Sequence, residues 1–107
     1  MTILEEVLLE EYNRILRTEA LIRKELQDLP KGYISRKTIK GKEYFYLQFR
    51  EDGKIRSKYI KREHLQSFQE KIELRKKDES ALKELTHSKT TIVKALGKEF
   101  INEHTAD

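Results

Sequence analysis

Apolar residues recur at spacings of four and three over the first 30 positions. Seven positions follow this spacing, and six of them are apolar: Leu8, Tyr12, Ile15, Ile22, Leu26 and Leu29. This period predicts an amphipathic helix. Thr2 and Glu5 have the spacing of a capping box, which favours a helix start at the N-terminus. Pro30 restricts the residue before it, so the helix is expected to end near Asp28.

Two features of this helix bear on its neighbours. Glu19 holds the seventh position of the apolar stripe, where it is expected to face solvent or to pair with Arg75 of a helix alongside. Leu9 and Leu16 widen the stripe. A wider stripe needs more than one neighbour to cover it.

The period changes from helical to alternating over residues 31–62. Two turn signals divide this segment, at Lys40-Gly41 and at Asp52-Gly53. Asp-Gly between alternating runs is typical of a β-hairpin. The run Tyr44–Phe49 is rich in the aromatic residues that favour strands. We therefore expect three antiparallel strands, over about residues 33–38, 43–50 and 54–60.

The second hairpin can close in two registers. A two-residue loop would place Arg56 opposite Phe49 and so put a cation beside a core residue. A three-residue loop, with Gly53 in a bulge, would place Ile55 opposite Phe49 instead. A one-residue slip exchanges the two faces of a strand. The apolar pattern favours the three-residue loop.

In that register the two faces of the sheet differ in character. The inner face is apolar and consists of Phe45, Leu47, Phe49, Ile55 and Tyr59. The outer face is aromatic, amide-bearing and cationic, and consists of Tyr44, Tyr46, Gln48, Arg50, Arg56 and Lys58. Closing the first hairpin in the same manner adds Arg36 to the outer face, beside Tyr44.

Helical spacing returns in residues 63–107. The run Thr86–Thr91 has poor helix propensity and is expected to break the helix, and a short last helix should contain Gly97. The sequence therefore predicts an α+β fold with a long N-terminal helix, a three-stranded antiparallel meander, and then one long broken helix or two C-terminal helices. At this length the chain is expected to be one domain, built from the segments 1–30, 31–62 and 63–107.

Charge is distributed unevenly among these segments. The whole chain has a formal net charge of only +4. Residues 31–62 hold 11 basic and 3 acidic side chains, for a net charge of +8, and both helical segments are net acidic. Cations on one face neutralise phosphates, and Gln, Arg and Tyr side chains contact base edges or stack on bases. We therefore expect the chain to bind DNA or RNA through the sheet.

The expected nucleic-acid site is the outer face. Its candidate phosphate contacts are Arg36, Arg50, Lys54, Arg56 and Lys58, and its candidate base contacts are Tyr44, Tyr46 and Gln48. Solubility offers a second interpretation, because lysines on edge strands also prevent aggregation. That interpretation explains less well why the segment has so few acids and two tyrosines on this face.

The amphipathic helices support an alternative function. A homodimer, or an adaptor that grips a partner helix, would use the widened stripe of the first helix: Leu8, Leu9, Tyr12, Ile15 and Leu16. The abundance of leucine on this helix favours such an interface.

Composition and spacing disfavour several other functions. The chain has no Cys, its three His residues lack metal-ligand spacing, and its four Gly residues form no phosphate-binding loop. Its carboxylates have the spacing of surface pairs with Lys and Arg. We therefore expect no metal, no cofactor and no enzymatic activity. No apolar run reaches the length of a membrane span, and the acidic N-terminus is unlike a signal peptide, so we expect a cytoplasmic protein without a membrane partner.

Motifs of the sheet segment resemble those of a known family. These motifs are LPKG at 29–32, KGK at 40–42, YLQFREDGK at 46–54 and SKYIK at 57–61. They look like a small bacterial and archaeal family of unassigned function, for which no catalytic residues are implied. The same spacing is similar to basic three-stranded N-terminal modules of transposases, and the layout to the sheet arms of tyrosine recombinases. Those resemblances imply a link to mobile-element or regulatory DNA.

Overall fold

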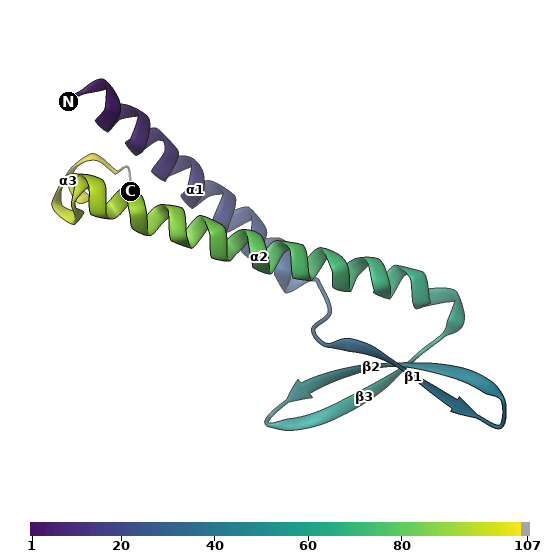
Figure 1. The fold of residues 1–107 in the computed structure, drawn as a ribbon. Coiled ribbons are helices and arrows are strands. Elements are labelled where there is room, and N and C mark those ends of the chain that lie inside the picture. Colours follow the sequence, from purple (N-terminus) through teal and green to yellow (C-terminus); the bar gives the residue numbers. More distant parts are fainter. Residues whose placement is uncertain (106–107) are drawn as a thin grey trace. The chain divides into compact units, whose positions relative to one another are not determined.

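The computed structural model of the chain describes residues 1–105. One long helix is followed by three strands, a single 3-10 turn at Arg62–His64, and two further helices (Figure 1). The predicted α+β fold is therefore confirmed. The chain forms two compact units. The helical unit consists of Met1–Gln27 and the chain from Asp78 onward, and the sheet unit consists of Asp28–Lys77.

The sheet unit contains an antiparallel meander of three strands. These are β1 (Tyr33–Ile39), β2 (Lys42–Glu51) and β3 (Lys54–Ile60), with β2 in the centre. Their bounds differ from the predicted ones by at most one residue, because the alternating pattern and the two glycine turns mark where each strand begins and ends.

The turn between β2 and β3 has two residues, so the predicted three-residue loop is wrong. Phe49 pairs with Arg56. Asp52 has a φ of 51° and Gly53 a φ of 76°. Positive φ at both central residues is the mark of a type I′ turn, which Asp-Gly favours and whose twist matches that of the flanking strands. The chemistry of the turn therefore outweighs the apolar pattern of β3.

One face of the sheet is covered by the first part of α2 (Leu65–Leu96). The buried residues there are Leu47, Ile60 and Ile72, and packed against them are Ile34, Phe45, Phe49, Leu65 and Phe68. We term this the inner face of the sheet and the opposite one the outer face. Arg75 of α2 donates a hydrogen bond from Nη1 to the carbonyl oxygen of Leu29 at 2.9 Å, which holds the chain before β1 to the same helix.

The register puts two cations of β3 on the inner face without burying their charges. Arg56 and Lys58 share this face with the core of β2, yet both are exposed because β3 is an edge strand. Long cationic side chains lay their aliphatic part along apolar surface and keep the charge in water. Ile55 and Tyr59, predicted to face inward, lie on the outer face and are exposed.

In the helical unit, α1 (Ile3–Gln27) begins at the predicted capping box. The backbone N–H of Thr2 donates to Glu5 Oε1 at 2.8 Å, and that of Glu5 donates to Thr2 Oγ1 at 3.1 Å. The helix ends one residue before the predicted end, and Ile15 is its fully buried apolar residue. Within residues 1–105, no helix combines the length and the apolar character that crossing a membrane would need.

The run Thr86–Thr91 does not interrupt α2, so the predicted break at this place is wrong. Thr90 donates its hydroxyl to the carbonyl oxygen of Thr86 at 3.0 Å, and Thr91 does the same with the residue four positions earlier, so these polar groups are satisfied within the helix. Ile92 is buried directly after the run, and such packing overrides low propensity. The helix ends at Leu96 instead, and a separate α3 (Lys98–His104) follows.

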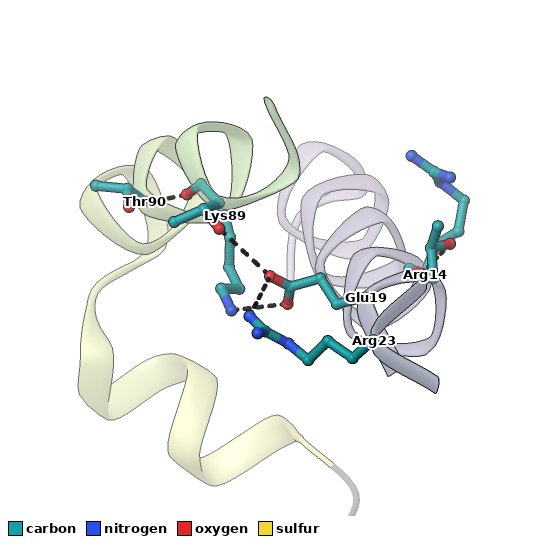
Figure 2. A network of polar contacts seen from close by, with 7 residues as sticks. Arg14, Glu19, Arg23, Lys89 and Thr90 are labelled. Carbon is teal, nitrogen blue, oxygen red and sulfur yellow. Dashed lines mark hydrogen bonds and ion pairs between the residues drawn. The ribbon is translucent and has the colours of Figure 1, made fainter. Parts of the chain in front are cut away.

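Glu19 lies between α1 and α2 and is only 5% exposed (Figure 2). Lys89 Nζ is 2.7 Å from Glu19 Oε1, and an Arg23 guanidinium nitrogen is 3.9 Å from Oε2. The prediction that Glu19 faces solvent is therefore wrong, and its partner on α2 is Lys89 rather than Arg75. The uninterrupted helix explains this pairing, because it brings a lysine from the predicted break alongside α1.

Candidate nucleic-acid interface

Residues that pair across antiparallel strands point to the same face of a sheet. The observed register therefore defines the outer face. It carries Tyr33, Ser35, Lys37 and Ile39 of β1, Lys42, Tyr44, Tyr46, Gln48 and Arg50 of β2, and Ile55, Ser57 and Tyr59 of β3. Four of the five tyrosines of the chain and three cations lie on this face, and no strand residue on it is a carboxylate.

The inner face has a different composition. Around its apolar centre lie four cations and both strand carboxylates: Arg36, Lys54, Arg56, Lys58, Glu43 and Glu51. Arg36 Nη1 is 3.5 Å from Glu43 Oε1, and Lys54 pairs with Glu51 across the turn. Two of the inner-face cations are thus beside an acid, whereas strand acids are absent from the outer face.

The structure brings together only part of the predicted site. Tyr44, Tyr46, Gln48 and Arg50 alternate along β2 and share the outer face as predicted. The other candidates lie on the inner face, so their predicted placement is wrong: Arg36, Lys54, Arg56 and Lys58. The physical reason is the register of both hairpins, since a one-residue slip moves every side chain of a strand to the other face.

Four outer-face residues were missed by the sequence reasoning: Tyr33, Lys37, Lys42 and Tyr59. The sequence feature that could have placed the residues of β1 and β3 is the pair of two-residue turns, a type I′ turn at Asp52-Gly53 and an equivalent turn at Lys40-Gly41. Both turns have positive φ at both residues. With two-residue turns, strict alternation assigns Tyr33, Lys37 and Tyr59 to the face of Tyr46. Lys42 joins them by alternation within β2 alone.

The tyrosines of the outer face contact one another and their polar neighbours. The rings of Tyr46 and Tyr59 meet edge to face, with centroids 5.7 Å apart and planes at 65°. Lys37 Nζ lies 4.9 Å from the centroid of the Tyr46 ring, within the range of a cation–π interaction. Tyr33 donates its hydroxyl to Gln48 Oε1 at 2.6 Å. These contacts hold aromatic rings, a cation and an amide in one surface.

The alternative helix interface is partly used within the helical unit. Ile15 is completely buried there, so it cannot contact a second protein. Leu8, Leu9, Tyr12 and Leu16 are half-buried. The large apolar residues exposed on α1 are others, namely Ile3, Leu4, Val7 and Leu21. The residues that the structure describes include no group of three or more His, Cys, Asp or Glu that could hold a metal ion.

A model of a protein family described as a domain of unknown function, DUF6788, matches residues 4–72. The chain belongs to the DUF6788 family. The match agrees with the expected family of unassigned function, and the similarity to transposase and recombinase modules stays a prediction. The part of the chain that matches the DUF6788 model runs from α1 through the entire sheet to the core residue Ile72 of α2. Neither a curated protein nor a solved structure matches the chain.

Proposed function

We propose that this protein binds nucleic acid through the outer face of its sheet. One observation carries the proposal: the face combines four tyrosines and three cations and has no strand carboxylate. Solubility alone requires charged residues of either sign on an exposed face. It does not require that both strand acids lie on the other face, nor that the tyrosines gather on this one.

The chemistry of the face suits a polyanion that also offers aromatic groups. Lys37, Lys42 and Arg50 can neutralise phosphates, because each places a positive charge on the same surface. Each phosphate neutralised releases condensed counterions, so three contacts predict a slope of log K against log salt of roughly −2 to −3. The Gln48 amide supplies hydrogen bonds beside those charges.

A binding titration at several salt concentrations tests the proposal. Labelled DNA and RNA, each single-stranded and duplex, would be titrated with the wild-type chain and with Arg50→Gln. The variant should bind several-fold more weakly, and its salt slope should be less steep by about 1. Arg56→Gln is the matched control, because it removes an exposed arginine of the same sheet from the inner face, and it should keep the wild-type slope.

Two results would contradict the proposal. One is the absence of binding to all four nucleic acids at low salt. The other is an equal loss of affinity in Arg50→Gln and Arg56→Gln, which would show that net charge rather than the outer face determines binding.

Self-association through α1 is a second candidate function. It is favoured by the apolar side chains exposed at the first turns of α1, where Ile3 is 80% and Leu4 67% exposed. Sedimentation of the wild-type chain should then show a dimer that Val7→Glu converts to a monomer. A wild-type monomer at all concentrations would eliminate this candidate.

A further inference from the structure

We infer that the ligand of the outer face is single-stranded nucleic acid, whose bases stack on Tyr33 and Tyr59. This inference rests on the proposed function and specifies its substrate class. Base stacking needs an aromatic ring with an accessible face, and every base has a π-face that such a ring can meet. Bases inside a duplex are already stacked on each other and are therefore unavailable to the rings.

The two rings are the most accessible aromatic groups of the sheet. Tyr33 is 58% and Tyr59 53% exposed, whereas Tyr44 and Tyr46 of the central strand are half-buried. The edge-to-face contact of Tyr59 with Tyr46 occupies at most one face of the Tyr59 ring, so at least one face is left for a base. The hydroxyl of Tyr33 is held by Gln48, which limits the positions of its ring.

The two rings are separated enough to take different bases. Tyr33 lies on β1 and Tyr59 on β3, with β2 between them, and their partners on β2 are two residues apart. Strand spacing and rise place their backbones roughly 10 Å or more apart. Tyr46 lies between them and is in contact with Lys37 and Tyr59. Tyr46 therefore supports the ring of Tyr59, and the Lys37 ammonium group over Tyr46 can bind the phosphate that connects the two stacked bases.

The number of cations also favours a single strand. A protein that binds a duplex strongly through about 6–10 phosphate contacts needs a similar number of cations, but the outer face offers three cations. A duplex on this face would thus lack both the charge and the stacking that a single strand receives. Sheets with exposed aromatic residues bind single-stranded RNA in this manner, with two or three bases stacked.

The experiment compares three labelled probes by fluorescence anisotropy: a thymidine strand and a uridine strand of about 15 nucleotides, and a mixed-sequence DNA duplex of the same length. The full chain should bind at least one single strand about tenfold or more tightly than the duplex. Tighter binding of the thymidine strand would identify DNA as the ligand, and tighter binding of the uridine strand would identify RNA. Either result supports the inference.

Paired substitutions test the stacking itself. Tyr59→Leu should weaken single-strand binding about five- to hundredfold, while Tyr59→Phe, which keeps the ring, should bind like the wild type. The pair Tyr33→Leu and Tyr33→Phe repeats the test on the other edge strand, in case one leucine variant unfolds. Far-ultraviolet circular dichroism of each variant verifies the fold.

The outcomes separate this inference from the proposed function. If the duplex binds as tightly as both single strands, or if the leucine variants bind like their phenylalanine counterparts, the stacking inference fails and binding by the outer face stands. If none of the probes binds at low salt, the proposed function itself fails.

Discussion

The side chain of Glu19 shows how one residue specifies the pairing of two helices. It is a carboxylate with almost no solvent exposure, and its bond to Lys89 joins positions 70 residues apart in the chain. Thr86 Oγ1 lies 3.5 Å from its other oxygen. A buried charge is costly unless it is paired, so alignments of α1 and α2 that separate Glu19 from Lys89 are disfavoured.

Removal of this partner should destabilise the helical unit. Lys89→Met leaves the buried Glu19 with only the Thr86 hydroxyl and the more distant Arg23, and we expect a loss of about 2–4 kcal/mol in the free energy of unfolding. Urea denaturation followed by circular dichroism measures this loss. Arg14→Met is the control, because its pair with Glu11 is exposed and should contribute little to the free energy of unfolding. Equal losses in the two variants would contradict the prediction.

Glu25 and Asp78 form a pair of carboxyl groups in the same unit. A hydrogen bond to Asp78, and next the charge of Asp78, raise the pKa of Glu25. Asp78 is itself buried, and its Oδ2 has no hydrogen-bond partner within residues 1–105. Because the pKa of Glu25 is higher in the folded than in the unfolded state, the stabilising contribution is complete below the unfolded value and is lost as pH rises through the folded value.

Asp78→Asn should therefore raise the Tm at neutral pH, where two carboxylates otherwise repel each other. The gain should shrink as the pH falls through the raised pKa of Glu25, because Glu25 is then protonated in the wild type. Thermal unfolding at a series of pH values measures this. Glu84→Gln removes an exposed carboxylate of α2 and should show no such pH dependence. A gain that is constant with pH, or a lower Tm at neutral pH, would refute the explanation.

At the scale of elements, β1 depends on a close backbone approach at Gly32. A Cβ at this position would lie 2.0 Å from the carbonyl oxygen of Gln48, and the φ of Gly32 is +113°. The chain before β1 therefore passes against the central strand at a distance that only glycine permits.

Gly32→Ala should lower the free energy of unfolding by at least about 3 kcal/mol. Gly53→Ala is a matched control in the same unit: its φ is +76°, and its Cβ would meet nothing within 4 Å. Its cost should be the backbone strain alone, about 1–2 kcal/mol. Urea denaturation of both variants measures the difference, and similar losses would show that β1 adjusts to the added methyl group.

The elements themselves could be predicted from the sequence, because their periods and stop signals are local. Alternation between two glycine turns marks the strands, and the spacing from Leu8 to Leu26 marks α1. The break expected at Thr86–Thr91 could not be corrected locally, since packing around Ile92 overrides propensity. The strand register depends on both the turn type and the apolar pattern, which here favour different pairings, and the Asp52-Gly53 turn determines the observed one.

In the candidate site, too, the sequence predicts what depends on local alternation but not what depends on the register. Tyr44, Tyr46, Gln48 and Arg50 share a face by alternation within β2 alone, so the sequence is sufficient to group them. Residues of β1 and β3 join that group only through the register. This is why Lys37 and Tyr59 were missed and why Arg56 was placed on the wrong face.

At the scale of the whole molecule, charge follows the two units. The sheet unit holds 15 basic and 7 acidic side chains, net +8, and the helical unit holds 8 basic and 12 acidic ones, net −4. A polyanion is therefore attracted to one unit and repelled by the other, and such a charge distribution orients the encounter of the two molecules.

The division into two units predicts separate local stabilities. Lys89→Met should accelerate amide hydrogen exchange in α1, because it weakens the helical unit, while the amides of β2 keep their wild-type rates. Exchange followed by mass spectrometry of peptides from Met1–Gln27 and Lys42–Glu51 measures both. Equal acceleration in the two peptides would show that the chain opens as one cooperative unit.

The gathering of tyrosines on the outer face also has an optical consequence. The chain contains no tryptophan, so its ultraviolet emission comes from tyrosine, and four of the five emitting side chains lie on that one surface. The unlabelled protein thus carries a built-in reporter of whatever covers the sheet. Tyr12 in α1 supplies the background signal, and Tyr12→Phe would remove it.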